Sequence, residues 1–521
     1  MSARAQTAGA AETARKFPPK SLRELLRGMA EVGRRDEREI RGISMDSRSI
    51  GAGELFIALP GGAHDGRDHI EDALAGGAAA VAREASAGAA PRARRRRSEA
   101  APRGAASARG APSFDIPDLR RHVGAIAARF YDHPSANMRL IGITGTNGKT
   151  TCAYLLAQAL GALGRRCALV GTLGAGFAGA LRPGELTTPG AADTQRILAE
   201  LRAESAEDVC LETSSHALAQ GRVNCVEFDI ALLTNLSRDH LDYHGDMRSY
   251  ARAKEILFRC ERLGAAVINI DDPFGRELLR RHRAASCLRY GMRSGDVRAH
   301  KVRLSDRGIE MELEHTALGR RAQLRSRLLG ALNAPNLLAA AAVLVACGFA
   351  LGEAADALGE CAPPPGRMEL WRAENTPGVV VDYAHTPDAL ARALESLGAL
   401  CRGRLWVVFG CGGDRDRGKR ARMGAAAEAF AARVIVTDDN PRNEDPAQIA
   451  AQIAAGMSAP PVIIHDRRRA IYAALAAAAP DDMVLVAGKG HETAQNRGAR
   501  VVRFSDREVV RDALGIAEGR A

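Results

Sequence analysis

The chain has 521 residues, too many for one compact core, and at about 150 residues per domain this length predicts roughly three domains. Its composition, 46% hydrophobic and 26% charged with ten cysteines that never form a Cys-x-x-Cys pair, argues against a disulfide framework and a zinc site, and no apolar run reaches the roughly 20 residues of a membrane span. The net charge of +11 does not indicate a nucleic-acid-binding face, because the segment from Ser86 to Ser113, with seven arginines and one glutamate, contributes +6 of it.

The N-terminal part predicts a disordered tail over residues 1–20 and a small α/β domain over residues 21–117. We expect a strand at Glu54 to Leu59 and a helix at Ile70 to Gly76. Residues 86–113 are mostly Arg, Ala, Gly, Pro and Ser, which bury too little apolar surface to fold, so they are interpreted as a flexible insertion. An ATPase that binds RNA through these arginines is an alternative, which the lack of interleaved aromatic residues disfavours.

A phosphate-binding loop is predicted where the apolar strand Leu140 to Thr144 gives way to a helix. The loop reads Gly145, Thr146, Asn147, Gly148, Lys149, Thr150 and Thr151. Its glycines let backbone N–H groups surround phosphate oxygens, Lys149 adds positive charge, and the Thr150 hydroxyl can hold Mg²⁺. The strict motif requires glycine at position 143, where this chain has Ile143, so the loop is a shortened variant. A plain turn before a helix is the alternative.

Strands and helices alternate over residues 118–366 and again over residues 367–521, which predicts parallel sheets covered on both faces. The expected strands are Asp208 to Leu211, Asp229 to Thr234, Ala265 to Asn269, Val379 to Asp382, Leu405 to Phe409, Val434 to Thr437 and Met483 to Ala487. The fold class is therefore α/β with three domains. The central domain is a P-loop-type ATPase domain with a mainly parallel sheet, and the C-terminal domain is Rossmann-like.

Ligands of such sheets bind beyond the carboxyl ends of the strands, and polar residues gather there in this chain. Glu212 and the run Asn235 to His244 follow two strands of the central region. Oxygen ligands suit Mg²⁺, although a structural role is the alternative for any single histidine. Further polar clusters are Gly366 to Glu369, Asp382 to Pro387, Gly410 to Asp416, Asp439 to Arg442 and Gly488 to Glu492.

On these motifs the chain resembles the Mur ligase family from about Ile43 onward. The resemblance implies an ATP-dependent ligase in which a carboxylate attacks the γ-phosphate and an amine then displaces phosphate from the acyl phosphate. It is strongest to members that add meso-2,6-diaminopimelate to UDP-N-acetylmuramoyl-L-alanyl-D-glutamate in peptidoglycan precursor synthesis. A sister ligase, such as a folylpolyglutamate synthase or another Mur ligase, is the alternative.

The same resemblance implies a monomer that uses Mg²⁺ as cofactor and ATP as co-substrate. The unpaired pattern of the cysteines, the lack of a signal-peptide core in Met1 to Lys20 and the lack of a membrane span predict a cytoplasmic protein without membrane insertion. The confinement of the excess charge to one segment predicts no nucleic-acid partner. Its partners are then the small-molecule substrates alone. Residues 21–117 would bind the UDP substrate, residues 118–366 ATP, and residues 367–521 the amino acid.

The catalytic residues implied by the resemblance are Lys149, Lys254 and His240. Lys149 would contact the β- and γ-phosphates. The magnesium ligands would be Thr150, Glu212, His240 and Lys254. Because an ammonium cannot ligate a cation, Lys254, which alone reads as a helix-surface lysine, is expected to be carbamylated to N6-carboxylysine. The remaining nucleotide contacts would be Asn333, Asn336, Arg367, Asp382 and His385.

The resemblance also supplies contacts for the two other substrates. Those of the UDP substrate are Met45, Ser47, Gly62, Ala63, His64, Thr187, Thr188, Ser214, Gln220 and Arg222. Those of diaminopimelate are Arg415, Asp439, Asn440, Pro441, Arg442, Gly488 and Glu492. Arg442 is expected to set specificity, because a guanidinium pairs with the second carboxylate that lysine lacks. A buried arginine left unpaired against lysine would strengthen the discrimination.

Overall fold

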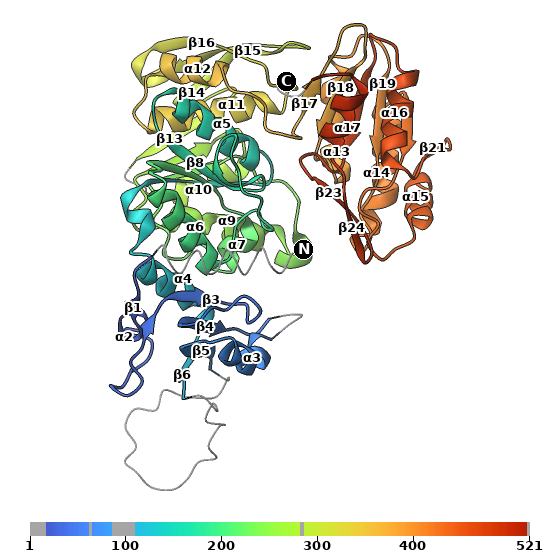
Figure 1. The fold of residues 1–521 in the computed structure, drawn as a ribbon. Coiled ribbons are helices and arrows are strands. Elements are labelled where there is room, and N and C mark those ends of the chain that lie inside the picture. Colours follow the sequence, from blue (N-terminus) through green and yellow to red (C-terminus); the bar gives the residue numbers. More distant parts are fainter. Residues whose placement is uncertain (1–16, 62–64, 86–109, 282–285, 518–521) are drawn as a thin grey trace. The chain divides into compact units, whose positions relative to one another are not determined.

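The structure is a computed structural model that describes residues 17–61, 65–85, 110–281 and 286–517 (Figure 1). The predicted turn of Gly62, Ala63 and His64 lies outside the described residues, as do residues 1–16 of the tail and 86–109 of the insertion. The chain divides into two compact units. The first consists of Met1–Thr144, Ala168–Ala231 and Arg238–Gly264, and the second of Gly145–Cys167, Leu232–Ser237 and Ala265–Ala521.

A small parallel sheet opens the first unit. Its strands are, in spatial order, β3 (Gly42–Ser44), β4 (Glu54–Ala58), β5 (Ala80–Glu84) and β6 (Ser113–Ile116). Phe56 and Val81 pack beside α3 (Ile70–Ala75), whereas Leu55 and Ile57 pack with Ile126 of α4 (Leu119–Phe130). Alternate residues of one strand therefore serve two apolar layers, as a sheet covered on both faces requires.

Two sequence-based expectations need correction in this region. Phe17 packs edge-on against Tyr131, with ring centroids 5.0 Å apart, and Lys20 belongs to β1 (Lys20–Ser21), so the predicted disorder does not extend to these residues. The predicted flexibility also fails at the end of the insertion. Pro112 accepts a hydrogen bond from the backbone of Val81, and β6 begins at Ser113, because backbone pairing with β5 fixes these residues.

The rest of the first unit consists of five hydrogen-bonded strands and several helices. The spatial order is β11 (Ile230–Leu233), β7 (Arg139–Thr144), β10 (Asp208–Glu212), β8 (Cys167–Gly171) and β9 (Gly174–Phe177). β7 and β10 are parallel, and β8 and β9 form an antiparallel pair. The remaining elements are β2 (Glu39–Ile40), α2 (Leu22–Leu25), α6 (Ala191–Ala203), α7 (Ser215–Ala219), α8 (Leu241–His244), α9 (Met247–Glu255) and the 3₁₀ turns η1 (Gly66–His69), η2 (Pro134–Asn137) and η3 (Ile256–Arg259).

The second unit opens with strands that change from parallel to antiparallel. β12 (Ala265–Asn269), β13 (Cys287–Gly291) and β14 (Val297–Ser305) are parallel, whereas β15 (Gly308–His315) and β16 (Arg320–Ser326) continue as an antiparallel meander. The sequence analysis did not foresee this meander. The helices of this part of the second unit are α5 (Lys149–Ala162), α10 (Pro273–Arg281), α11 (Asn333–Ala346) and α12 (Leu351–Gly359), and the 3₁₀ turn η4 (Thr316–Leu318) joins two of the strands.

A second sheet of this unit has the spatial order β17 (Glu369–Trp371), β18 (Gly378–Asp382), β22 (Met483–Ala487), β19 (Leu405–Phe409), β20 (Arg433–Val436) and β21 (Val462–Ile463). All neighbours except β17 and β18 run parallel. The hairpin of β23 (Ala494–Arg497) and β24 (Arg500–Arg503) follows.

Helices cover both faces of this sheet. Val380, Val407 and Leu485 share a core with α13 (Pro387–Gly398), α14 (Gly418–Phe430) and α15 (Pro446–Ala454). Their sequence neighbours Val379, Val408 and Val484 pack instead with α16 (Arg467–Ala477) and α17 (Asp506–Ala513). Because both faces are buried, the strands read as continuous apolar runs, as predicted for a Rossmann-like domain. Among the described residues, no helix is long and apolar enough to span a membrane.

A fully buried ion pair joins the two helices on one face of this sheet. The Arg467 guanidinium donates to both carboxylate oxygens of Asp506 at 2.7 Å, and neither side chain is exposed to solvent. A further Arg467 N–H donates to the Ala487 carbonyl at 2.8 Å, at the end of β22. The pair therefore holds α16 and α17 against the end of a central strand.

We expect Arg467→Met to lower the free energy of unfolding by about 3–5 kcal/mol, because it leaves the Asp506 charge buried without its partner. Both tryptophans of the chain, Trp371 and Trp406, lie in this sheet, so tryptophan fluorescence during urea denaturation reports its unfolding. Arg503→Met, which removes an exposed partner of Glu508, should cost about 1 kcal/mol or less. Equal effects of the two changes would contradict a stabilising role for the buried pair.

Candidate functional site

The phosphate loop takes a shape that only glycine permits at two positions. Gly145 has φ +150° and Gly148 has φ +87°. A Cβ at Gly145 would lie 1.8 Å from Thr234 Oγ1, and one at Gly148 would lie 2.3 Å from Asn336 Oδ1. Helix α5 begins at Lys149 without a side-chain cap, so its first N–H groups remain suited to an anion.

Hydrogen bonds fasten this loop to the segment after β11. The Thr146 N–H donates to the Asn235 carbonyl at 2.9 Å, and the Asn147 N–H donates to Asn235 Oδ1 at 2.9 Å. In return, the Thr234 hydroxyl donates to the Asn147 carbonyl at 2.6 Å. The first residues of the polar run predicted from sequence therefore shape the phosphate loop.

Lys149 folds back over the loop that precedes it. Its ammonium donates to the carbonyls of Gly145 at 2.8 Å and Thr146 at 2.9 Å. Asn336 from α11 lies beside Gly148, and its amide donates to Asn333 Oδ1 at 3.0 Å. The two asparagines predicted as nucleotide contacts thus lie next to the loop from which they are separated by almost 200 positions in the sequence.

In the first unit, Glu212 ends β10 as a completely buried carboxylate. It accepts hydrogen bonds from the backbone N–H of Thr172 at 2.8 Å and from the Thr172 hydroxyl at 3.2 Å. Glu212 thus brings carboxylate oxygens to the end of the strand. The donor set fits the predicted Mg²⁺ ligand, because Mg²⁺ prefers carboxylate oxygen.

Five predicted contacts of the UDP substrate lie together near this carboxylate. The Thr188 hydroxyl donates to the Glu212 carbonyl at 2.6 Å and accepts from the Ser214 N–H at 3.0 Å. Arg222 donates to the Thr188 carbonyl at 3.0 Å and to Gln220 at 2.8 Å. Thr187 lies 3.1 Å from the Thr172 hydroxyl. The predicted contacts Met45 and Ser47 follow β3, where Met45 is exposed.

Rings cluster around His216, which the sequence analysis did not include in the site. Its ring centroid lies 4.8 Å from that of His240, 4.2 Å from that of Tyr243 and 5.4 Å from that of His244. Burial, with help from the charges of His240 and His244, lowers the pKa of His216 to about 4. Burial therefore favours the neutral form of His216 at pH 7.

Lys254 lies in the last turn of α9 and is buried rather than on the helix surface. Its exposed fraction is 1%, and its ammonium lies 4.5 Å from the centre of the Tyr250 ring. Among the described residues, no three His, Cys, Asp or Glu side chains come together as metal ligands. A Mg²⁺ site here would accordingly need a hydroxyl or a modified lysine as well.

Two predicted nucleotide contacts of the second unit, Arg367 and His385, lie against the ring of Tyr383. Arg367 lies 4.6 Å from the centre of the Tyr383 ring, and the His385 ring lies 4.6 Å from the same ring. Asp382 accepts hydrogen bonds from the N–H groups of Met368 and Ala384, at 2.7 and 2.8 Å. Burial raises the pKa of this carboxyl. The Arg367 Nε is buried and has no hydrogen-bond partner among the described residues, so it can donate to a ligand.

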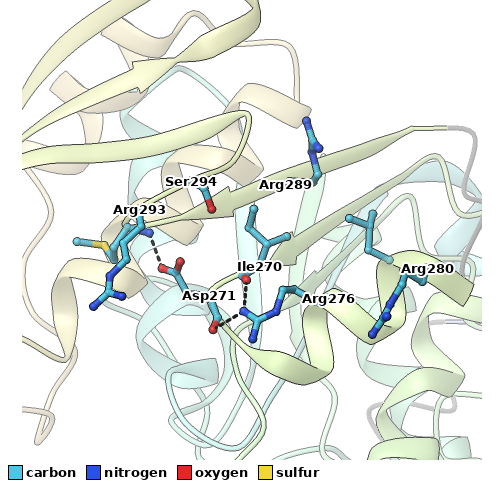
Figure 2. Close-up of a pocket in the computed structure, with 9 residues that line it drawn as sticks. Ile270, Asp271, Arg276, Arg280, Arg289, Arg293 and Ser294 are labelled. Carbon is cyan, nitrogen blue, oxygen red and sulfur yellow. Dashed lines mark hydrogen bonds between the residues drawn. The ribbon is translucent and has the colours of Figure 1, made fainter.

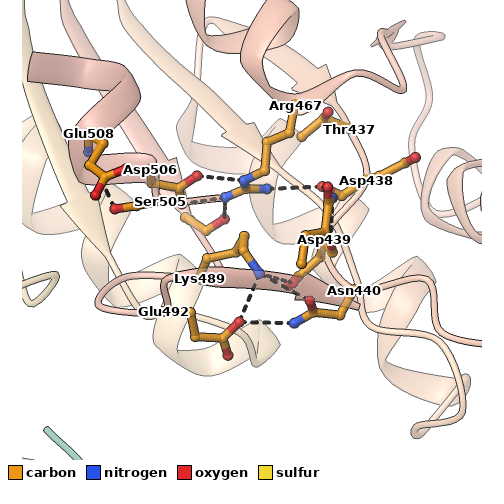
Figure 3. A network of polar contacts seen from close by, with 12 residues as sticks. Thr437, Asp438, Asp439, Asn440, Arg467, Lys489, Glu492, Ser505, Asp506 and Glu508 are labelled. Carbon is orange, nitrogen blue, oxygen red and sulfur yellow. Dashed lines mark hydrogen bonds and ion pairs between the residues drawn. The ribbon is translucent and has the colours of Figure 1, made fainter. Parts of the chain in front are cut away.

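The predicted amino-acid contacts form a polar network at the ends of β20 and β22 (Figure 3). Asn440 donates to Glu492 Oε2 at 2.9 Å. Gly488, with φ +113°, approaches Asp439 so closely that a Cβ would lie 3.0 Å from Asp439 Oδ2. Burial raises the pKa of Asp439, against the effect of Arg467 and Lys489.

Two arginines of the predicted set lie close to Gly412. A Cβ at Gly412 would lie 2.9 Å from Arg442 Nη1 and 3.6 Å from Arg415 Cγ. Arg442 donates to the Gly413 carbonyl at 2.8 Å and has φ +50°, and Pro441, which precedes it, is buried. Arg442 is half-buried rather than buried, so a smaller penalty for losing its partner is expected.

Two buried cations of this network were missed by the sequence analysis. Lys489 contacts Asn440 and Glu492, and Arg467 contacts Asp506. Lys489 stands within the predicted cluster Gly488 to Glu492, so that motif was the available signal. No local pattern marked Arg467, since its partner lies far along the sequence.

A hollow of about 1100 Å³ lies beyond the ends of β12 and β13, and none of the predicted site residues lines it (Figure 2). Arg276 donates there to the carbonyls of Ile270 at 2.7 Å and Asp271 at 3.0 Å. Arg289 is paired with Asp296, and Asp271 brings a carboxylate into the same hollow. The positive charge of its arginines is therefore partly neutralised.

Comparisons with known proteins agree over nearly the whole chain. Family models match three consecutive segments: "Mur ligase family, catalytic domain" at residues 39–131, "Mur ligase middle domain" at 143–344, and "Mur ligase, glutamate ligase domain" at 366–490. A protein of Alkalilimnicola ehrlichii named UDP-N-acetylmuramoyl-L-alanyl-D-glutamate--2,6-diaminopimelate ligase is 48% identical, over 96% of this chain and 99% of that protein.

Two further matches bear the same name. One, of Ectopseudomonas mendocina, is 47% identical over 92% of this chain and 96% of that protein. The other is a solved structure with a TM-score of 0.67 and 36% identity, covering 95% of this chain and 99% of that chain. The chain is thus similar in sequence and in fold to ligases of one named activity.

We expect Gly148→Ala to weaken ATP binding by at least about tenfold, because alanine is strained at this φ and its Cβ would clash with Asn336. Isothermal titration calorimetry with ATP and Mg²⁺ measures the change. Gly161→Ala is the matched control in the same helix, since a Cβ there meets nothing within 4 Å. Wild-type affinity in Gly148→Ala would show that this loop does not hold the phosphates.

Proposed function

Because the chain belongs to the Mur ligase family, we propose that it is an ATP-dependent ligase that adds meso-2,6-diaminopimelate to UDP-N-acetylmuramoyl-L-alanyl-D-glutamate. The observation that carries the substrate choice is that the loop Asp439 to Arg442 is bonded through Asn440 to Glu492, while Arg442 of the same loop donates to the Gly413 carbonyl. Together they offer both carboxylates and a guanidinium to a diamino dicarboxylic acid.

The reaction fits a site that positions charges. The carboxylate of the D-glutamyl residue attacks the γ-phosphorus of ATP and releases ADP, and the amine of the incoming amino acid then displaces phosphate to form the amide. Glycine-shaped backbone and Lys149 suit the phosphates of ATP. The protein supplies orientation and charge neutralisation and forms no covalent bond to the substrates.

We further propose that Thr150, Glu212, His240 and a carbamylated Lys254 hold Mg²⁺, which would neutralise charge on the transferred phosphoryl group. Lys254 is buried, and reaction of its amine with CO₂ would place an oxygen donor inside the protein at that position. The carbamate that results is a carboxylate-like oxygen donor.

The incoming amino acid would meet complementary charges. The carboxylates of Asp439 and Glu492 suit an ammonium group, and the guanidinium of Arg442 suits the second carboxylate. Arg415, which also lies close to Gly412, adds a further positive charge. Lysine would give the Arg442 guanidinium no carboxylate to bind, which favours diaminopimelate.

We expect the protein to act as a monomer in the cytoplasm on small molecules alone. All proposed contacts come from one chain, and all ten cysteines are free thiols within the described residues, as suits a reducing compartment.

The proposal is tested by measuring ADP formation with UDP-N-acetylmuramoyl-L-alanyl-D-glutamate and either meso-diaminopimelate or L-lysine. Activity with meso-diaminopimelate is expected to exceed that with lysine. Arg442→Ala should lower kcat/KM for meso-diaminopimelate by about 10- to 150-fold, the equivalent of a charge-assisted hydrogen bond. Arg500→Ala, an exposed change on β24, should leave it unaltered. Unchanged kinetics in Arg442→Ala would refute the specificity role.

For Lys254, we expect alanine to lower the rate by at least about a hundredfold, because it removes the oxygen donor that would hold the metal. Short carboxylic acids added to the assay should restore part of the rate. Arg252→Ala, an exposed change on the same helix, serves as the control. Full activity in Lys254→Ala would rule out the proposed modification as a catalytic requirement.

A further inference from the structure

Lys489 is a fully buried cation at the centre of the amino-acid network. It follows β22 after one glycine, and its side chain has 0% exposure. Its ammonium donates to Asn440 Oδ1 at 3.1 Å and to Glu492 Oε2 at 2.8 Å, and lies 3.8 Å from Asp439 Oδ1 (Figure 3). All of its polar partners come from the loops after β20 and β22.

Oxygens of the protein already surround the Lys489 ammonium. A lysine ammonium has three N–H donors, and these three oxygens surround it in a place from which solvent is excluded. Burying such a charge is favourable only when partners of this kind compensate for its lost hydration. Lys489 therefore has little capacity for a direct bond to a substrate.

Its partners, in contrast, retain capacity for one. Asn440 Oδ1 accepts from Lys489 and from the Asn496 N–H at 2.9 Å, while Asn440 Nδ2 donates to Glu492 Oε2 at 2.9 Å. Oε2 of Glu492 thus accepts two hydrogen bonds, whereas Oε1 accepts none within the described part of the chain. The Glu492 side chain is 31% exposed, so Oε1 is accessible to a ligand.

The charge of Lys489 also acts on the Glu492 carboxylate. Asp439 and Glu492 are two carboxylates in one buried corner, and Lys489 lies between them. Burial alone would raise the pKa of Glu492, but Lys489 and Asn440 outweigh it and hold that pKa below its ordinary value. The Lys489 ammonium contacts both carboxylates and so reduces the repulsion between them.

We propose that Lys489 is a positioning residue of the amino-acid site, which fixes the Glu492 carboxylate with Oε1 turned toward the ammonium group of the incoming amino acid. The inference rests on the proposed function. It adds a residue that would act on substrate affinity through Glu492 and would not touch the substrate.

The experiment compares steady-state kinetics of the full-length wild-type protein, Lys489→Met, Glu492→Gln and the double variant. Lys489→Met is expected to raise KM for meso-diaminopimelate by about 10- to 100-fold, the size of a charge-assisted interaction, with kcat and KM for ATP changed by less than about threefold. In the Glu492→Gln background, Lys489→Met should raise KM for meso-diaminopimelate by less than about threefold, because the carboxylate through which Lys489 acts is absent. Lys301→Met, which removes an exposed lysine bonded to Glu312, is the matched control.

An equal effect of Lys489→Met in both backgrounds, or an unchanged KM in an active enzyme, would overturn the inference. Absence of ADP formation by the wild type with meso-diaminopimelate would instead refute the proposed function. Tryptophan fluorescence checks that the variant is folded. If Lys489→Met is unfolded, Lys489→Gln, which keeps a hydrogen-bond donor without the charge, must show the same rise in KM and the same dependence on Glu492.

Discussion

Burial of parallel strands on both faces is the constraint on which the sites of this protein depend. The strands β18, β19 and β22 bear apolar side chains in both directions, so no polar group can be placed along them without losing its hydration. Polar chemistry is therefore restricted to the loops at the strand ends. Asp382 shows the boundary, because it closes β18 and takes two backbone N–H groups as soon as the strand stops.

The two units meet this constraint in different ways. The second unit builds its phosphate loop from backbone, with glycine conformations fixed by contact with Thr234 and Asn336. The first unit uses side-chain hydroxyls as well, since the Thr172 hydroxyl donates to the Glu212 carboxylate and the Thr188 hydroxyl donates to the Glu212 carbonyl. Backbone amides suit a chemically constant group such as phosphate, whereas side chains can be adapted to a more varied substrate.

Much of the fold was predictable from sequence, because buried parallel strands leave apolar runs bounded by polar residues. The predicted ranges Ala265 to Asn269, Leu405 to Phe409 and Met483 to Ala487 are the strands of the structure. The meander β14–β16 was missed. Its outer residues are charged and pair across strands, as Glu312 does with Arg321, so it lacks the apolar run of a buried strand.

The candidate site was predictable where a motif marked a strand end, and less so where burial decided the role. Lys254 reads as a surface residue because its helix is otherwise polar, and only packing shows that it is enclosed. Arg467 and Lys489 find their partners through the tertiary fold, and for Arg467 no spacing along the chain brings it to Asp506. Motifs therefore indicated the loops of the candidate site, and three-dimensional packing identified the buried cations that contact or lie near those loops.

The internal bonds of Lys149 have a consequence for ligand selectivity. Because its ammonium already binds the carbonyls of Gly145 and Thr146, any anion must offer more than two neutral acceptors to draw it away. A monovalent ion such as chloride offers a single charge in exchange for these two bonds, whereas a triphosphate offers several charged oxygens. On this geometry we expect the loop to discriminate by charge, because a ligand must replace two existing bonds of Lys149 before it gains the ammonium.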